Sequence, residues 1–211
     1  MFSADIKWHR QSLDTEALAA LDAIFATRGK PGARLPLDDA LRAALAPIDQ
    51  LIAQDAPGMA PVRVLAFDKS DATNWSLPWH QDRVIAVASR ADLQEFHNWS
   101  RKQGIWHCEP PTNFLTDMLF VRVHLDDADE SAGAMEIAMG SHAAGLVPAD
   151  RAETVAGDYP AHLCTARRGD VLILPMLTLH RSRAAERPAT RRVLRVDYAA
   201  SSLPPPLVWA N

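Results

Sequence analysis

The stretch GDVLILPMLTLHRSRAAERPATRRVLRVDY, residues 169–198, decides the fold class. It contains three short runs rich in β-branched and other apolar residues, at 170–175, 177–182 and 191–198. Such runs are typical of strands, and the Gly-, Pro- and charge-rich segments between them indicate tight connections. The stretch therefore predicts consecutive strands rather than helices.

Three similar runs precede it: PVRVLAF at 61–67, RVIAVA at 83–88 and MLFVRVHL at 118–125. Clusters of turn-forming residues separate them. Many short strands with few intervening helices favour an antiparallel sandwich or barrel over a parallel sheet. The segment 89–108 is the exception, because its pattern allows one short helix.

The first part of the chain is predicted to be helical. Two helices are expected there, and the later one covers 37–54, where Pro47 predicts a kink or a split. We expect a helical cover over 1–57 and a β core over 61–200, together one domain over 1–211. The earlier of the two helices is predicted by apolar residues at three- and four-residue spacing, namely Leu18, Leu21, Ile24 and Phe25.

Composition and charge exclude several classes of protein. With 48% hydrophobic and 23% charged residues, the chain is not disordered. The formal net charge of −4 offers no basic field for nucleic acid. No apolar run is long enough to span a membrane, and the polar start of the chain is unlike a signal peptide. Two cysteines, Cys108 and Cys164, fit a reducing compartment, so we expect a soluble cytoplasmic protein.

The sharpest chemical pattern is His80-Gln81-Asp82 in the stretch WHQD. In an extended chain the first and third residues project from one face, so an imidazole and a carboxylate could share one metal ion at the start of a strand. The alternative is a hydrogen bond between the two side chains. His124 and Asp126 have the same spacing, but there a strand that ends in solvated carboxylates is the simpler interpretation.

A third ligand is expected near the end of the chain. If the strand of His180 forms a hairpin with the strand of Arg191, the two residues face each other, and Ser182 shares the face of His180. One strand pair would then offer an imidazole, a hydroxyl and a guanidinium, which matches a carboxylate. The alternative is that Arg191 and Arg192 are surface charges on an edge strand.

Two histidines and one carboxylate form the facial triad of non-haem Fe(II) oxygenases. WHQD, the spacing of eleven residues from His180 to Arg191, GAMEIAMGSHAAG at 133–145 and RRGDVLILPMLTLHRS at 167–182 together resemble the phytanoyl-CoA dioxygenase family. The resemblance implies a mainly β fold with flanking helices. This fold is a double-stranded β-helix, a cupin-like jelly roll, with N-terminal helices packed on it and the metal at its open mouth.

The resemblance also implies a function, with Fe(II) and 2-oxoglutarate as cofactors. The expected reaction is the hydroxylation of a small-molecule substrate by O₂, with release of succinate and CO₂. The family's iron ligands, and thus its catalytic centre, are matched by His80, Asp82 and His180. Its contacts to 2-oxoglutarate are matched by Arg191, Ser182, Lys69 and Trp99. The carboxylate of Asp82 favours hydroxylation, because halogenating relatives lack it.

Other positions carry weaker expectations. Asn74, Trp75 and Trp79 precede the first ligand and are candidates to line the pocket, whereas His142 is expected to brace a turn. Two other functions remain open from the sequence. One is a cupin-like hydrolase or isomerase that holds zinc or manganese with the same ligands, and the other is a jelly-roll binding domain without catalytic activity.

Overall fold

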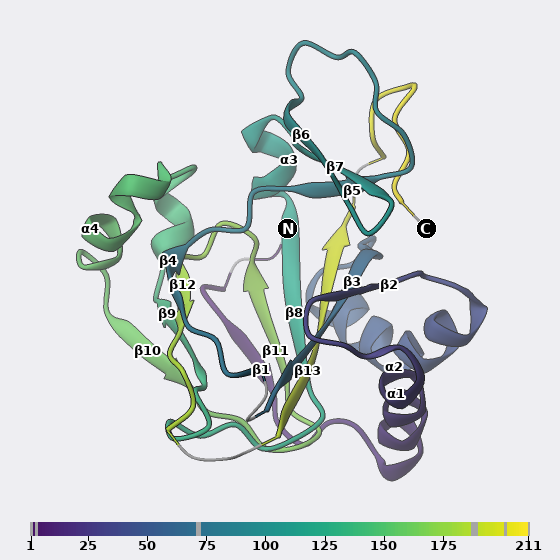
Figure 1. The fold of residues 1–211 in the computed structure, drawn as a ribbon, viewed down its shortest axis with the longest axis vertical. Helices are drawn as coiled ribbons and strands as arrows, with labels where there is room; N and C mark the ends of the chain where they lie inside the picture. Colours follow the sequence, from purple (N-terminus) through teal and green to yellow (C-terminus); the bar gives the residue numbers. More distant parts are fainter. Residues whose placement is uncertain (1, 3, 71–72, 187–189, 201, 211) are drawn as a thin grey trace.

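The computed structural model describes residues 2, 4–70, 73–186, 190–200 and 202–210. Its strands form three antiparallel sheets, and its two longest helices lie together at one side (Figure 1). This arrangement confirms the expected mainly β fold with N-terminal helices.

The largest sheet has six strands in the order β1-β11-β8-β13-β3-β2. All of its pairings are antiparallel. In this order the strands are β1 (Lys7–His9), β11 (Val171–Pro175), β8 (Met118–His124), β13 (Arg191–Ala199), β3 (Ala60–Lys69) and β2 (Ala33–Leu35). The predicted strands 61–67, 118–125, 170–175 and 191–198 are therefore confirmed.

The second sheet has four strands in the order β10-β9-β12-β4. Its apolar side chains join those of the first sheet in one core cluster, which includes Ile137 of the second sheet and Phe120 and Leu174 of the first. The two sheets thus enclose a common interior, as in a jelly roll. The strands are β10 (Ala161–Cys164), β9 (Met135–Ala138), β12 (His180–Ser182) and β4 (Leu77–His80).

The third sheet consists of β5 (Ile85–Val87), β7 (Ile105–Glu109) and β6 (His97–Lys102). The expectation of a helix within 89–108 is wrong, because β6 and β7 form a hairpin there. Its two-residue turn holds Gln103 and Gly104 at φ angles of 51° and 83°. Two successive positive φ angles match the twist of a hairpin and are incompatible with a right-handed helix.

Helices α1 (Thr15–Arg28) and α2 (Asp39–Asp55) cover the outer face of the six-stranded sheet. The side chains of Asp14 and Asp38 cap their first turns. Pro47 does not split α2, which runs through it as one helix. No helix in the described part of the chain combines the length and the apolar composition needed to cross a membrane. Shorter helical segments are α3 (Thr112–Thr116), η2 (Ser141–Ala144), η3 (Ala149–Arg151) and α4 (Ala152–Ala156).

Strand β13 presents different chemistry on its two faces. Leu194 and Val196 point outward into the core cluster beneath the helices. Arg192 also points outward, where it pairs with Asp22 of α1 at 2.9 Å and with Asp126 at 2.7 Å. By the period of two, Arg191 lies on the opposite, inner face. Residue order along this strand therefore decides which arginine enters the interior.

The expected hairpin between the strands of His180 and Arg191 is wrong. β12 pairs with β4 and β9, whereas β13 pairs with β3 and β8 in the other sheet. The chain between them passes from one sheet to the other, as jelly-roll connections do. His180 and Arg191 consequently face each other across the interior rather than along one ladder.

Acid sensitivity is expected from His124, which is buried at the end of β8 and stacks on Trp8. Burial and the nearby charge of Arg122 lower the pKa of His124 to about 3. Below pH 6.5 the unfolded chain binds a proton at this imidazole that the folded chain does not, so the free energy of unfolding should fall. The expected loss between pH 6.5 and 5 is about 2 kcal/mol from this residue. Denaturant titrations of wild type and His124→Gln check it, since the variant should depend less on pH.

Candidate metal centre

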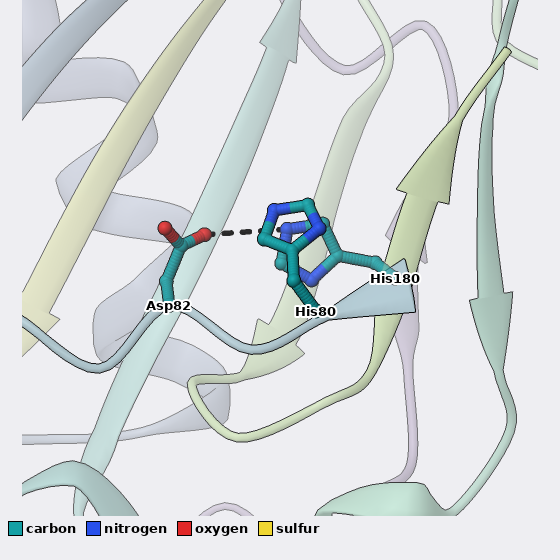
Figure 2. Close-up of side chains that lie close together, drawn as sticks. All are labelled: His80, Asp82 and His180. Atoms are coloured by element: carbon teal, nitrogen blue, oxygen red, sulfur yellow. Dashed lines mark ion pairs between the residues drawn. The ribbon is translucent and has the colours of Figure 1, made fainter. Parts of the chain in front are cut away.

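Three side chains, from the adjacent strands β4 and β12 and from the segment that follows β4, converge at the inner face of the four-stranded sheet (Figure 2). His80 ends β4 and lies directly opposite His180 of β12 in the strand register. The centroids of their rings are 4.3 Å apart. Asp82 lies two residues beyond His80, and one ligand atom from each of the three residues lies within 4.8 Å of the others. Such a group could hold one metal ion.

Backbone contacts orient both imidazoles. The Nδ1 of His80 is 2.8 Å from the carbonyl oxygen of Pro78, and the Nδ1 of His180 is 2.9 Å from that of Thr178. A proton on each Nδ1 satisfies these carbonyls and leaves the Nε2 lone pairs free to bind a metal. Burial, together with the charge of His180, lowers the pKa of His80, which favours the neutral form that a metal requires. The donor set therefore fits a divalent ion such as Fe(II).

Asp82 is held in its ionised form. Its Oδ2 is 3.2 Å from the Nε2 of His180 and accepts a hydrogen bond from the Nη1 of Arg195. Burial alone would raise the pKa of this carboxyl, but Arg195 and His180 hold it well below its usual range. Arg195 is itself buried and also donates to Asp197 at 2.7 Å, which in turn accepts from Arg63 at 2.5 Å.

Polar contacts from neighbouring loops fix the positions of the ligands. The side chain of Gln81 points away from the metal ligands and bonds the carbonyl oxygens of Gly145 and Leu177 and the amide of Val147. Ser141, which is fully buried, accepts a hydrogen bond at 2.9 Å from the amide of Leu179. The segment that contains Ser141 thus braces the residue directly before His180.

A cavity of about 180 Å³ lies between the two sheets and contains the three ligands in its wall. The six-stranded sheet and the four-stranded sheet both contribute side chains to it. Its lining residues are Phe67, Trp75, Leu77, His80, Asp82, Arg122, Met135, His180, Arg181, Ser182, Arg191 and Arg195. The cavity is thus flanked by imidazoles on one side and guanidinium groups on the other.

Lys69 and Arg191 form the cationic end of this region. They lie opposite each other on β3 and β13. The Nζ of Lys69 donates to the hydroxyl of Ser182 at 3.2 Å and to the carbonyl oxygen of Arg183 at 2.5 Å. Arg191 donates from Nη1 to the carbonyl oxygen of Gly133 at 2.7 Å. Burial lowers the pKa of Arg191 to about 10, as expected for a cation without an acidic neighbour.

Gly133 makes room for this arrangement. Its φ angle is +67°, and a Cβ atom there would lie 2.6 Å from the oxygen of Arg183 and 2.9 Å from the Nζ of Lys69. Both distances are shorter than van der Waals contact, so a side chain at this position would displace the lysine. The first glycine of GAMEIAMGSH, Gly133, is thus explained by close packing.

Comparison with known proteins gives the family. The model of the family described as Phytanoyl-CoA dioxygenase (PhyH) matches residues 23–193, which is most of the chain. The chain belongs to the phytanoyl-CoA dioxygenase family. No curated protein matches it. The resemblance based on WHQD and the distal His180 is therefore confirmed.

Solved structures support the same fold. AviO1 from Streptomyces viridochromogenes Tue57 is 20% identical, with a TM-score of 0.63 over 97% of this chain and 93% of that one. SnoN, titled a non-heme alpha ketoglutarate dependent epimerase from nogalamycin biosynthesis, is 15% identical, with a TM-score of 0.66 over 94% and 80%. HygX from Streptomyces hygroscopicus, solved with nickel and 2-oxoglutarate bound, is 17% identical, with a TM-score of 0.61 over 94% and 83%. At these identities the similarity shows the fold of the dioxygenase family.

Two of the tryptophans predicted to be functional lie away from the cavity. Trp99 belongs to β6, where its Nε1 donates to the carbonyl oxygen of Phe96 at 2.9 Å and its ring packs against Trp106. The hairpin that replaces the expected helix carries it into the third sheet, so it is not among the cavity-lining residues. Trp79 packs against the α4 region in a separate apolar cluster.

The other candidates differ in how near they lie to the ligands. Trp75 lines the cavity. Asn74 bonds the backbone of Ala185 through both ends of its amide. The Nδ1 of His142 is 4.0 Å from Asp5, outside the metal centre. Asp126, part of the competing pattern, pairs with Arg192 on the outer side of the sheet.

Two buried arginines of the cavity wall, Arg122 and Arg195, were not predicted from the sequence. Both point inward from central strands, opposite each other in the register of β8 and β13. A signal for Arg195 was available, because it lies four residues after Arg191 and therefore on the same face of a strand. Arg122 interrupts the apolar run MLFVRV at 118–123, which also indicated an unusual buried cation.

Proposed function

We propose that this family member is an Fe(II)- and 2-oxoglutarate-dependent dioxygenase that hydroxylates a small-molecule substrate. One observation carries the proposal: His80, Asp82 and His180 converge on one sheet, and Arg191 faces them across a shared cavity. Metal ligands together with a separate cation are what a chelating 2-oxo diacid requires. HygX, which has the same fold, is titled with nickel and 2-oxoglutarate bound, which supports these cofactors.

Each residue has a definite task in this proposal. His80, Asp82 and His180 would hold Fe(II), and three coordination positions would stay open. Arg191 would bind the carboxylate of 2-oxoglutarate that is remote from the metal, next to Ser182 and Lys69. Bound iron, with O₂ and 2-oxoglutarate, supplies the oxidation of a C–H bond and yields succinate and CO₂.

The mouth of the cavity indicates where a substrate would bind. Leu77 is 42% exposed at its rim, and the aromatic rings of Phe67 and Trp75 lie 6.4 Å apart in its wall. These apolar surfaces exclude water from the reacting groups and would contact the carbon skeleton of the substrate. Relatives of the same fold are titled an epimerase and a carbocyclase. The carboxylate of Asp82 at the metal supports hydroxylation over halogenation.

The test is oxygen-dependent formation of succinate from 2-oxoglutarate by protein that has been reconstituted anaerobically with Fe(II). Turnover is expected even without the true substrate, at a low rate, and a panel of small molecules should raise it. Absence of succinate under all these conditions would contradict the dioxygenase assignment. A metal-loaded protein that does not bind 2-oxoglutarate would instead indicate hydrolase or isomerase chemistry.

A substitution of Arg191 tests the anchor separately from the metal. Arg191→Met should weaken 2-oxoglutarate binding by about 10- to 100-fold, because a charge-assisted contact of about 1.5–3 kcal/mol is lost. Metal content should stay unchanged, since Arg191 lies on the opposite sheet. Calorimetric titration of the Ni(II)-loaded protein measures the first quantity, and elemental analysis measures the second. Unchanged affinity for 2-oxoglutarate would remove Arg191 from the proposal.

A further inference from the structure

A second buried guanidinium lies beside the cosubstrate anchor. The backbone of Arg122 lies on β8, opposite Arg195 of β13. Its Cζ nevertheless lies 5.8 Å from the centroid of Phe67 on β3, which is paired with Val193 of β13. The side chain of Arg122 therefore crosses β13 on the inner face and extends toward the end of the cavity that contains Arg191.

Among the residues that the structure describes, no carboxylate forms an ion pair with either guanidinium group. Arg122 is 8% exposed and Arg191 is 3% exposed, and both line the cavity. In the described part of the chain, Arg122 stacks on the ring of Phe67 and Arg191 donates to the carbonyl oxygen of Gly133, while the Nε atom of each has no hydrogen-bond partner. Buried arginines are normally paired, so two incompletely bonded guanidinium groups in the wall of one cavity indicate that an anion belongs there.

Repulsion among these cations points to the same conclusion. Burial and the charges of Arg191 and Arg195 lower the pKa of Arg122 to about 9. Burial and the charges of Arg191 and Arg122 likewise lower the pKa of Lys69 to about 8. Lys69 already donates to Ser182 and to the backbone, whereas the arginines keep unused donors. An incoming carboxylate would relieve this repulsion and accept hydrogen bonds from both arginines.

We propose that Arg122 is a further cosubstrate-binding residue, which binds the metal-remote carboxylate of 2-oxoglutarate together with Arg191. The inference rests on the proposed function, since it takes 2-oxoglutarate as the cosubstrate. In this proposal the cavity supplies two guanidinium groups, those of Arg122 and Arg191, to one carboxylate. It also implies that the metal-free protein binds 2-oxoglutarate through this end of the molecule.

The experiment compares two ligands on the Ni(II)-loaded protein. 2-Oxoglutarate and 2-oxobutyrate share the 2-oxo acid group that chelates a metal, but only 2-oxoglutarate carries the second carboxylate. Arg122→Met should bind 2-oxoglutarate about tenfold more weakly by calorimetry and should bind 2-oxobutyrate as wild type does. Arg122→Lys, which keeps the charge but not the two-pronged donor, should lose less.

Thermal unfolding of the metal-free protein gives a second readout. Arg122→Met should unfold at a higher temperature than wild type, because it removes a buried charge without a partner. The same variant should gain less stability from added 2-oxoglutarate. A structural arginine would give the opposite sign in the first measurement.

Three results would overturn the inference: unchanged 2-oxoglutarate affinity in Arg122→Met, an equal loss for both ligands, or a lower unfolding temperature without ligand. If Arg122→Met does not fold, Arg122→Lys is decisive, because it must weaken 2-oxoglutarate but not 2-oxobutyrate. Failure of the proposed function looks different. In that case wild type does not bind 2-oxoglutarate, or Arg191→Met binds it unchanged.

Discussion

Replacing His180 with alanine is expected to abolish stoichiometric metal binding. His180 supplies one of the three ligand atoms found among the described residues, and its Nε2 is oriented by the contact of Nδ1 with the carbonyl oxygen of Thr178. Changes in the residues that merely orient a ligand cost about 10- to 100-fold in affinity, so the loss of a ligand costs more. Elemental analysis after dialysis against Fe(II) or Ni(II) measures the effect.

A matched control tests whether the loss of metal is specific to His180 or follows the removal of any histidine. His97→Ala removes an exposed imidazole from β6 in the third sheet and should retain the full metal content. Circular dichroism should show that both variants fold. If His180→Ala retained as much metal as His97→Ala, His180 would not be a ligand.

Replacing Arg195 with methionine is expected to lower the free energy of unfolding strongly. This arginine is 4% exposed and bridges two carboxylates, Asp82 and Asp197. Burial opposes its charge, but the two carboxylates raise its pKa above the usual value. Removing one partner of a buried ion pair leaves the others uncompensated and costs about 3–5 kcal/mol. Denaturant unfolding of the metal-free protein measures this loss.

Metal should restore part of that stability. A divalent ion at the centre would take over the pairing with Asp82, so the difference between Arg195→Met and wild type should shrink in excess Ni(II). Arg101→Met, at an exposed arginine of β6, is the control and should change stability by less than about 0.5 kcal/mol. A loss in Arg195→Met as small as in this control would show that the buried pairs contribute little.

Local pattern predicted the central strands and the helices, because both depend on residues close together in the sequence. Each of the six predicted runs contains a strand, and four of them, 61–67, 118–125, 170–175 and 191–198, consist almost entirely of strand residues. In the other two, 83–88 and 177–182, only Ile85–Val87 and His180–Ser182 form strands. The short strands β4, β9 and β10 carry no such signal, since pairing with neighbours rather than local propensity makes them strands.

The motifs singled out His80, Asp82 and His180, which the structure brings together, but the strand pairing that does so was not predicted. A hairpin between the strands of His180 and Arg191 was expected because they are close in sequence, whereas the fold sends them to opposite sheets. Both arrangements bring the two residues to one cavity, so the proposed function does not depend on the expected hairpin. Trp99 was matched to a cosubstrate contact only through the family resemblance, whereas the hairpin with the Gln103–Gly104 turn places it in the third sheet.

The alternation of Arg191 and Arg192 links the helical cover to the chemistry of the interior. A shift of β13 by one residue would exchange the two arginines, placing Arg191, the proposed cosubstrate anchor, outside and Arg192 inside. The ion pairs of Arg192 with Asp22 and Asp126 oppose that shift, because they form only in the observed register. Helix α1, which contributes no residue to the cavity wall, therefore helps to hold β13 in the register that places Arg191 in the cavity.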